Sequence, residues 1–330
     1  MSFDPKKREN LTAAMKAEIS SFLQAMLLDG LMAAKQWTTR DLVFHGGTSI
    51  HLVWNSPRYS EDLDFMISSE RAEDLSAAVE ASATRISEKI KSPDAPPRIG
   101  AMADAAITVT SSNKKMENEN RNLLVFDVKW THPTKHGTVR VKLEFYAVPP
   151  QVLHSYQSGQ GFQGSGIPEM GLQPAVRADI LPDRKLFMAE DLLVQESVPV
   201  ATPQSIYGDK VVALAMRPYL KHRDFFDLWW LRTQMGLVMN DDDAVAAVRS
   251  SCAVYGYSDD TITERAAFLL TLPPSEIENL EQNLKAFLPE RVHDAFSRED
   301  AFRDMFTGAM NELERVRHLL SQTPVGAFQA

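Results

Sequence analysis

The chain has 330 residues, of which 44% are hydrophobic and 24% charged, and its formal net charge is −9. This composition is typical of a soluble globular protein and leaves room for two domains. No apolar run approaches the ~20 residues that a membrane-spanning helix needs, and no apolar segment follows the basic residues near the start, so we expect no membrane span, no secretory signal and a cytoplasmic location. The single Cys252 excludes an internal disulfide framework and a cysteine-based zinc site.

The charge is unevenly distributed along the sequence. Residues 1–150 contain 19 Lys and Arg against 19 Asp and Glu, so the whole net charge of −9 lies in residues 151–330. A protein that binds nucleic acid over its whole surface has more Lys and Arg than Asp and Glu residues. Any contact with RNA or DNA must therefore use local basic patches or a small footprint.

Two helices are predicted near the beginning of the chain. Apolar residues recur at three- and four-residue steps over residues 9–36, where we expect Gly30 to break or end the helix. Residues 70–91 are amphipathic and rich in alanine, and a cluster of serine and proline residues at 92–97 ends this second helix. The first helix is expected to pack on the sheet that follows it.

The most informative stretch is residues 43–67, VFHGGTSIHLVWNSPRYSEDLDFMI. An apolar lead-in precedes Gly46 and Gly47. Because glycine has no Cβ atom, the backbone of such a pair can approach a ligand closely and aim its N–H groups at anionic oxygens. The stretch therefore begins with a candidate phosphate-binding turn.

The same stretch ends in an alternating run at residues 60–67, which predicts a β-strand with two different faces. Ser60, Asp62 and Asp64 share one face, while Leu63, Phe65 and Ile67 point into a core. Two carboxylates on one face repel each other unless water, a cation or a proton separates them. Mg²⁺ prefers oxygen ligands and also binds substrate phosphates, so this face is a candidate metal site. The competing interpretation is a surface turn followed by an edge strand with solvated acids.

Three further strands are predicted, at residues 105–111, 123–131 and 138–148. The last two flank residues 132–137, which have the composition of a longer hairpin loop. Glu144 lies on the polar face of the last strand and is the candidate third carboxylate for a two-metal site. Alternatively, Glu144 pairs with Lys142 or Lys129 on an exposed face.

A long loop is predicted at residues 155–183, which are rich in Gly, Gln and Pro. It is either a mobile flap or a junction between lobes, and the sequence does not distinguish the two. Beyond residue 240 the chain is predicted to be helical, at residues 241–254, 260–271, 275–287 and 298–321. The histidines show no HxxxH or HExxH spacing, and the glycine motifs of dinucleotide-binding and P-loop proteins are missing, so neither zinc nor those folds are expected.

A second informative stretch begins at Thr202, a candidate N-cap that precedes a proline in the first helical turn. Lys210, Arg217 and Asp224 are spaced by seven residues and would share one face of a continuous helix, but Pro218 predicts a break. Such a face is usually solvated. Together with the first stretch, however, a cationic Lys210 has a chemical use, because charge on a transferring phosphoryl group needs a positioned cation.

The two informative stretches together resemble the AbiEii/AbiGii-type nucleotidyltransferase toxins, a family of the polymerase-β-like nucleotidyltransferase superfamily. Order and spacing match: Gly-Gly-Thr at 46–48, then R-x-S-x-D-x-D at 58–64, then the lysine-bearing helix, then R-D-x-x-D at 223–227. The matching regions cover less than about a fifth of the chain, but their pairing is more specific than either part alone.

This resemblance implies an α+β fold. A polymerase-β-like nucleotidyltransferase core, with a small mixed sheet flanked by helices, is expected at residues 1–150, and a mainly α-helical C-terminal lobe at residues 151–330. The implied activity is Mg²⁺-dependent transfer of a nucleoside monophosphate from an NTP to an acceptor hydroxyl, with a tRNA 3′ end as the best-known acceptor. The implied role is the toxin of a toxin–antitoxin or abortive-infection system, with a cognate antitoxin protein as partner.

The residues with an expected role fall into three groups. The phosphate-binding group is Gly46, Gly47 and Thr48, to which we add Arg58 and Ser60. The catalytic group is Asp62, Asp64, Lys210 and Asp224. The metal-binding group, expected to hold two Mg²⁺ ions, is Asp62, Asp64 and, from the strand pattern, Glu144.

Three features depart from the family pattern. Thr48 stands where the wider superfamily has Ser, thirteen residues separate it from Asp62, and the third carboxylate is a Glu. Within the same fold, the alternative is nucleotidylation of a small molecule or a protein hydroxyl, which the near-neutral first half of the chain slightly favours over RNA. From a different class, the alternative is a non-catalytic partner-binding module that retains the fold.

Overall fold

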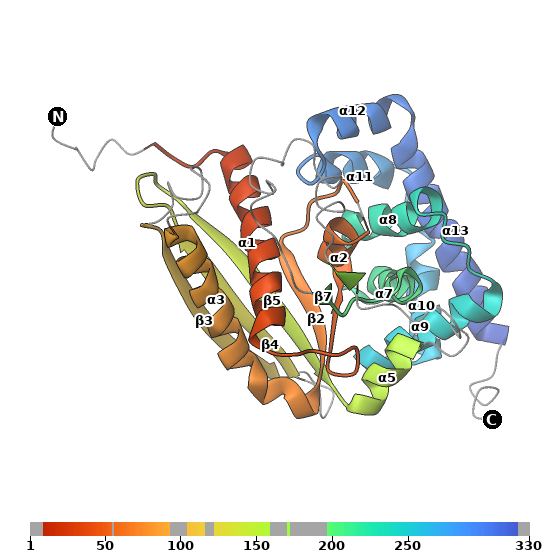
Figure 1. Ribbon diagram of the computed structural model, residues 1–330. Coiled ribbons are helices and arrows are strands. Elements are labelled where there is room, and N and C mark those ends of the chain that lie inside the picture. Colours follow the sequence, from red (N-terminus) through yellow and green to blue (C-terminus); the bar gives the residue numbers. More distant parts are fainter. Residues whose placement is uncertain are drawn as a thin grey trace. The chain divides into compact units, whose positions relative to one another are not determined.

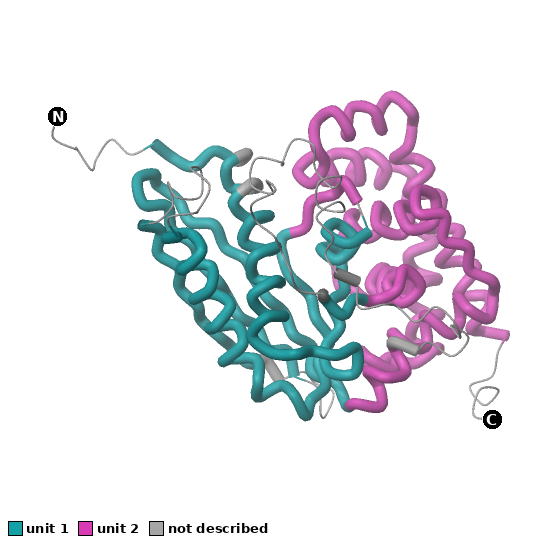
Figure 2. The backbone as a smooth tube through the Cα atoms, in the orientation of Figure 1, with its two compact units in different colours: residues 1–55, 61–149, 168–200 teal, residues 56–60, 150–167, 201–330 magenta. Residues whose placement is uncertain are grey.

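The structure is a computed structural model that describes residues 9–54, 56–92, 104–115, 122–158, 170–171 and 197–322. The chain forms two compact units, which Figure 2 shows in different colours. Unit 1 consists of Met1–Asn55, Glu61–Pro149 and Pro168–Val200. Unit 2 consists of Ser56–Ser60, Pro150–Ile167 and Ala201–Ala330. A short piece of the N-terminal half, residues 56–60, thus belongs to the unit that contains most of the C-terminal half.

Unit 1 is built on a five-stranded mixed sheet in the order β1-β2-β5-β4-β3. The β2–β5 pair is parallel and the other pairs are antiparallel. The strands are β1 (Leu42–His45), β2 (Asp62–Ser68), β5 (Thr138–Val148), β4 (Asn122–Thr131) and β3 (Ala106–Lys115). The expected small mixed sheet is confirmed, although β2 begins at Asp62, so Ser60 lies outside the strand.

Helices of unit 1 cover one face of this sheet, where α1 (Ala13–Ala34) and α3 (Leu75–Lys91) lie side by side (Figure 1). A 3₁₀ turn, η2 (Ser69–Asp74), leads into α3, and the short α2 (Gly46–Leu52) connects β1 toward β2. Between helices and sheet lies an aromatic core in which the rings of Phe65 and Phe145 stack with centroids 4.7 Å apart. Both side chains are fully buried, and each such burial stabilises the fold by ~1.5–3 kcal/mol.

The prediction that Gly30 breaks or ends the first helix is wrong, because α1 continues through it to Ala34. Gly30 has a packing role instead. A Cβ atom at this position would lie 2.9 Å from the Cα atom of Ser82 on α3. The Ser82 hydroxyl also donates a 2.9 Å hydrogen bond to the carbonyl of Leu27, so the glycine allows α1 and α3 to pack closely.

Unit 2 is helical in its described residues, apart from connecting turns. Its helices are α5 (Pro150–Ser158), α7 (Pro203–Met216), α8 (His222–Trp229), the π-helical η3 (Trp230–Gln234), α9 (Asp241–Tyr255), α10 (Asp259–Leu269), α11 (Glu276–Leu284), α12 (Glu290–Arg298) and α13 (Ala301–Gln322). Thr202 caps α7 as predicted, because its side chain accepts a hydrogen bond from the backbone N–H of Ser205. The chain also breaks where Pro218 predicts, between α7 and α8.

Helix α12 was missing from the sequence-based prediction. Its nine residues, ERVHDAFSR, are mostly polar, and its apolar stripe of Val292, Ala295 and Phe296 is too short to show a repeated period in the sequence. Pro289 is the N-cap of this helix. The predicted loop at 155–183 is helical at its start, since α5 extends to Ser158. Two residues of it, Met170–Gly171, form β6, which pairs with β7 (Ser197–Val198), and the rest lies outside the described residues. In the part of the chain that the structure describes, no helix is long and apolar enough to span a membrane.

Candidate functional site

Three carboxylates gather on one face of two adjacent strands in unit 1. The parallel register of β2 and β5 places Asp62 opposite Lys142 and Asp64 opposite Glu144. Because directly opposed residues point to the same side of a sheet, all four side chains share a face. The residues between them, including Leu63, are fully buried on the other face. The sheet thus brings Glu144 beside the aspartate pair, as the strand pattern predicted.

The ammonium of Lys142 lies among these carboxylates. Its Nζ atom is 3.2 Å from Oε1 of Glu144 and 3.9 Å from Oδ1 of Asp62. The alternative expectation that Glu144 pairs with Lys142 is therefore also met. One cation stands against three carboxylates, so the face keeps a negative excess.

Burial and the repulsion of Asp64 raise the pKa of Asp62 to about 6, and the nearby Lys142 only partly opposes this rise. A face with an excess of negative charge and only oxygen donors suits a hard divalent cation. Among the described residues, no group of three or more His, Cys, Asp and Glu side chains is arranged closely enough to hold a metal ion. The donor chemistry of the expected metal site fits Mg²⁺, while the carboxylates do not converge on one point.

Gly46 lies directly against this face. Its φ of +76° is in the left-handed region that favours glycine, and a Cβ atom there would lie 3.0 Å from both Cβ and Cγ of Asp64. Two independent constraints therefore require glycine at this position. Where a turn was expected, the structure has the start of a helix: Gly46 is the first residue of α2, and Gly47 and Thr48 lie in its first turn.

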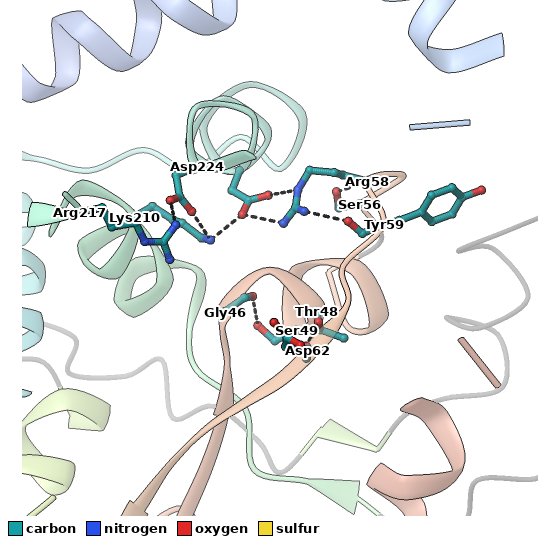
Figure 3. Close-up of polar contacts among 11 residues, drawn as sticks. Gly46, Thr48, Ser49, Ser56, Arg58, Tyr59, Asp62, Lys210, Arg217 and Asp224 are labelled. Atoms are coloured by element: carbon teal, nitrogen blue, oxygen red, sulfur yellow. Dashed lines mark hydrogen bonds and ion pairs between the residues drawn. The ribbon is translucent and has the colours of Figure 1, made fainter. Parts of the chain in front are cut away.

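The hydroxyl groups that follow the glycine pair are buried and already bonded (Figure 3). Thr48 Oγ1 donates to the backbone carbonyl of Asp62, and Ser49 Oγ donates to the carbonyl of Gly46 at 2.8 Å. The Thr48 side chain thereby ties α2 to the first residue of β2. This contact gives Thr48 a positioning role for Asp62.

A second cluster of charged residues lies in unit 2, around the break between α7 and α8. Lys210 on α7 is buried, and its Nζ atom is 2.8 Å from Oδ1 of Asp224 and 2.6 Å from Oδ2 of Asp227. Both carboxylates belong to α8, where a spacing of three residues puts them on one face of the helix. The break at Pro218 thus brings Lys210 to the helix that carries Asp224.

Arg58 joins the same cluster through Asp227. Its Nε and Nη2 atoms donate to the two oxygens of Asp227 at 2.6 and 2.9 Å, and its Nη1 atom donates to the carbonyl of Tyr59 at 2.8 Å. The Arg58 side chain is 2% exposed. Arg217, which is about one-third exposed, pairs with Asp224 and completes the cluster. We call Arg58, Lys210, Arg217, Asp224 and Asp227 the ion-pair network (Figure 3).

The surroundings of Lys210 and Asp224 in the network favour the charged forms of both side chains. Burial disfavours the ammonium of Lys210, but the attraction of Asp224 and Asp227 outweighs burial and raises the pKa of Lys210 above its usual value. Burial likewise disfavours the Asp224 carboxylate, but Lys210 and Arg217 outweigh it and hold the pKa of Asp224 at about 2. Three cations and two carboxylates leave the network with a formal charge of +1.

Sequence reasoning missed Asp227, although a signal was present. The motif R-D-x-x-D at 223–227 contains both aspartates of α8, and only Asp224 was assigned a role. The structure also separates the expected site residues between the units. Unit 1 brings together Gly46, Asp62, Asp64 and Glu144, with Gly47 and Thr48, and unit 2 brings together Arg58, Lys210 and Asp224, with Ser60 at the end of the segment 56–60.

A family model described as the nucleotidyl transferase AbiEii toxin of a type IV toxin–antitoxin system matches residues 28–321. The chain belongs to this family. This AbiEii-family protein is therefore a nucleotidyltransferase toxin, and membership implies an NTP substrate and an antitoxin partner. The α+β fold described above is the fold expected of it.

Solved structures give matches to the AbiEii-family protein over nearly its whole length. A putative nucleotidyltransferase from H. pylori is 13% identical with a TM-score of 0.44, and the match covers 93% of this chain and 96% of that one. MenT4, the nucleotidyltransferase toxin Rv2826c from Mycobacterium tuberculosis H37Rv, is 17% identical with a TM-score of 0.44, covering 94% and 95% of the two chains. A comparison with curated proteins found no match.

Proposed function

We propose that this toxin transfers a nucleoside monophosphate from an NTP to the 3′-terminal hydroxyl of a tRNA in a Mg²⁺-dependent reaction. The observation that carries the proposal is the parallel register of β2 and β5, which places Asp62, Asp64 and Glu144 on one face beside Gly46. Family membership supplies the reaction class. The use of tRNA as acceptor and the dependence on Mg²⁺ are proposals.

Asp62, Asp64 and Glu144 are the residues that would hold Mg²⁺. When bound, the ion supplies charge stabilisation at the phosphoryl oxygens and orients the substrate. The acceptor oxygen forms a bond to the α-phosphorus, the bond between the α-phosphorus and its bridging oxygen to the β-phosphate breaks, and pyrophosphate leaves. The electron pair of the broken bond leaves with pyrophosphate, and the proton of the acceptor hydroxyl passes to water.

The glycine pair and Thr48 prepare the position of the triphosphate in this proposal. The backbone of Gly46 is partly exposed and is the proposed neighbour of a phosphate, while the space of its missing Cβ atom is taken by Asp64. Gly47 continues this backbone into α2. Thr48 acts by holding the start of β2, and with it Asp62, in place.

The ion-pair network supports two kinds of role. Lys210 is the proposed catalytic cation and Asp224 the carboxylate that keeps it charged and oriented. Arg58 was expected to contact phosphate, but its burial and its two hydrogen bonds to Asp227 favour a positioning role. Ser60, four residues before Asp64, is a further proposed contact for the nucleotide.

The test incubates the purified protein with each α-³²P-labelled NTP, Mg²⁺ and total tRNA. Wild type is expected to label RNA with at least one nucleotide, and Asp62→Asn to lower the rate at least about 100-fold, because a group that stabilises the reacting phosphate is removed. Glu61→Gln removes the same charge from the exposed neighbouring side chain and is the matched control, with a rate within about twofold of wild type.

Three other results would contradict the proposal. Label that resists RNase and is found on protein or on a small molecule would show that the acceptor is one of these and not tRNA. If Asp62→Asn transferred the nucleotide as fast as wild type, the Asp62 carboxylate would have no role in the reaction. Metal-dependent nucleotide binding without transfer to any acceptor would indicate a binding module of the same fold.

A further inference from the structure

We call the side chains of Asp62, Asp64, Lys142 and Glu144, which share one face of β2 and β5, the carboxylate face. Of these four residues, Lys142 is the one to which the proposed reaction gives no role. It lies on β5, two residues before Glu144 and directly opposite Asp62. Its ammonium is within 4 Å of oxygens from both residues, 3.2 Å for Glu144 and 3.9 Å for Asp62. Because Asp62 and Glu144 come from different strands, the lysine bridges two carboxylates that repel each other.

A purely structural role explains this position poorly. The side chains of Lys142, Asp62 and Glu144 are 32%, 36% and 30% exposed. Ion pairs with this much contact with water contribute only ~0–1 kcal/mol to stability. The strand pair itself is secured by its hydrogen-bonded register and its buried aromatic residues. The lysine is therefore best explained by the charge of the carboxylates it faces.

A divalent cation at the proposed site would bind the same two carboxylates, Asp62 and Glu144, that Lys142 pairs with. A cation bound by Asp62 and Glu144 would lie close to the ammonium, because both ions are held by the same two carboxylates, and the two positive charges would repel each other at such short separation. The side chain of Lys142 is long and flexible and one-third exposed, so it can leave without disturbing the strands. An ammonium released beside a bound NTP would find phosphate oxygens as its new partners.

We propose that Lys142 competes with the divalent cation for Asp62 and Glu144 and, once displaced, binds the phosphates of the NTP. This inference rests on the proposed metal site and assigns a regulatory contact to it. Lys142 weakens binding of the metal alone and strengthens binding of metal and nucleotide together. The toxin thereby favours loading of the cation with its NTP over loading of the cation by itself.

The first test measures Mn²⁺ binding by electron paramagnetic resonance, with no nucleotide present. Lys142→Met removes the charge and keeps a side chain of similar length, and it is expected to tighten Mn²⁺ binding about three- to tenfold. The matched control is Lys91→Met, which makes the same charge change at an exposed position at the end of α3 and is expected to bind as wild type. Lys142→Arg keeps the charge and is expected to remain within about twofold of wild type.

Asp62→Asn separates failure of the inference from failure of the proposed site. If Asp62→Asn loses Mn²⁺ while Lys142→Met binds it as wild type does, the competition is wrong and the metal site stands. If Asp62→Asn binds Mn²⁺ as wild type does, the metal site is wrong and the competition falls with it. Circular dichroism of each variant establishes that it is folded.

The second test follows the ammonium itself in the wild-type protein. Acetylation of Lys142 is quantified by mass spectrometry, with the peptide containing Lys91 as an internal reference. Mg²⁺ alone is expected to raise the rate of acetylation of Lys142, because the cation releases it from the carboxylates. Mg²⁺ with a non-hydrolysable NTP is expected to lower the rate again. A rate unaffected by Mg²⁺ would overturn the displacement, and a rate that stays high with the nucleotide would overturn the phosphate contact.

Discussion

The carboxylate face of unit 1 and the ion-pair network of unit 2 use similar residues in opposite ways. On the carboxylate face, three acids meet one lysine, the side chains of Asp62, Lys142 and Glu144 are about one-third exposed, and the pKa of Asp62 is raised. In the network, three cations meet two acids, and Lys210 and Asp224 are buried with pKa values shifted toward the charged forms. The first arrangement lacks positive charge and is suited to take up a cation. The second satisfies its own charges and is suited to hold its geometry.

This difference predicts that loss of one carboxylate has unequal effects in the two units. The largest effect is expected for Asp227→Asn, since Arg58 and Lys210 would lose a partner inside unit 2. Breaking a buried ion pair by removing one partner costs about 3–5 kcal/mol. Urea unfolding measures the loss. The matched control is Asp127→Asn, which breaks the pair with the half-exposed Arg140 and is expected to cost less than about 1 kcal/mol. If the two variants lost the same free energy of unfolding, the ion-pair network of unit 2 would be no more important for stability than the exposed ion pair of unit 1.

A second prediction concerns how tightly the carboxylate face is packed where it meets Gly46. Gly46→Ala adds both a left-handed backbone strain of about 1–2 kcal/mol and a clash with Asp64. Gly236→Ala adds the same kind of strain, with φ of +66°, but its Cβ atom would meet nothing within 4 Å. We expect both variants to lose stability in urea, Gly46→Ala by more, and only Gly46→Ala to lose nucleotidyl transfer. A Gly46→Ala variant as active as Gly236→Ala would show that Asp64 can move freely.

The smallest expected effect has the opposite sign. A carboxyl group whose folded pKa is raised from 3.8 to about 6 destabilises the fold above pH 6, and this cost disappears as pH falls to about 4, where the group is protonated in the folded chain. Asp62→Asn is therefore expected to stabilise the protein at pH 8 by at most about 1 kcal/mol, after allowance for the exposure of the side chain, and to have no effect near pH 4. Urea unfolding in EDTA at the two pH values measures this. A loss of stability at pH 8 would mean that Lys142 fully compensates the acids.

Local patterns made much of unit 1 predictable. The strand at residues 138–148 was predicted with its observed bounds, and the alternation of polar and apolar residues placed Glu144 on the same face as the aspartates. Both predictions rest on the two-residue period of a strand, which sequence displays directly. The motif spacing then indicated the family.

Contacts between distant residues were not predictable in the same way. Arg58 and Asp227 are 169 positions apart, and nothing local to Arg58 shows that it is buried against a helix of the other half. The same holds for Gly30, whose role depends on Ser82 of another helix. Helix α12 was missed for a different reason, since its apolar positions cover little more than one helical turn among polar residues. Tertiary packing decided the cases of Arg58 and Gly30.

The placement of residues 56–60 in unit 2 affects how the toxin is made. Arg58 leaves the ribosome 169 residues before Asp227, which at 5–20 residues per second is an interval of roughly 10–30 s. During that time Asp227, the carboxylate that binds its guanidinium in the folded chain, has not been made, and the segment that carries Arg58 cannot reach its final position in unit 2. The same interval separates the first strands of the sheet from completion of the ion-pair network. A nascent chain interrupted before α8 would contain every carboxylate of the proposed metal site and still lack the folded form of the toxin.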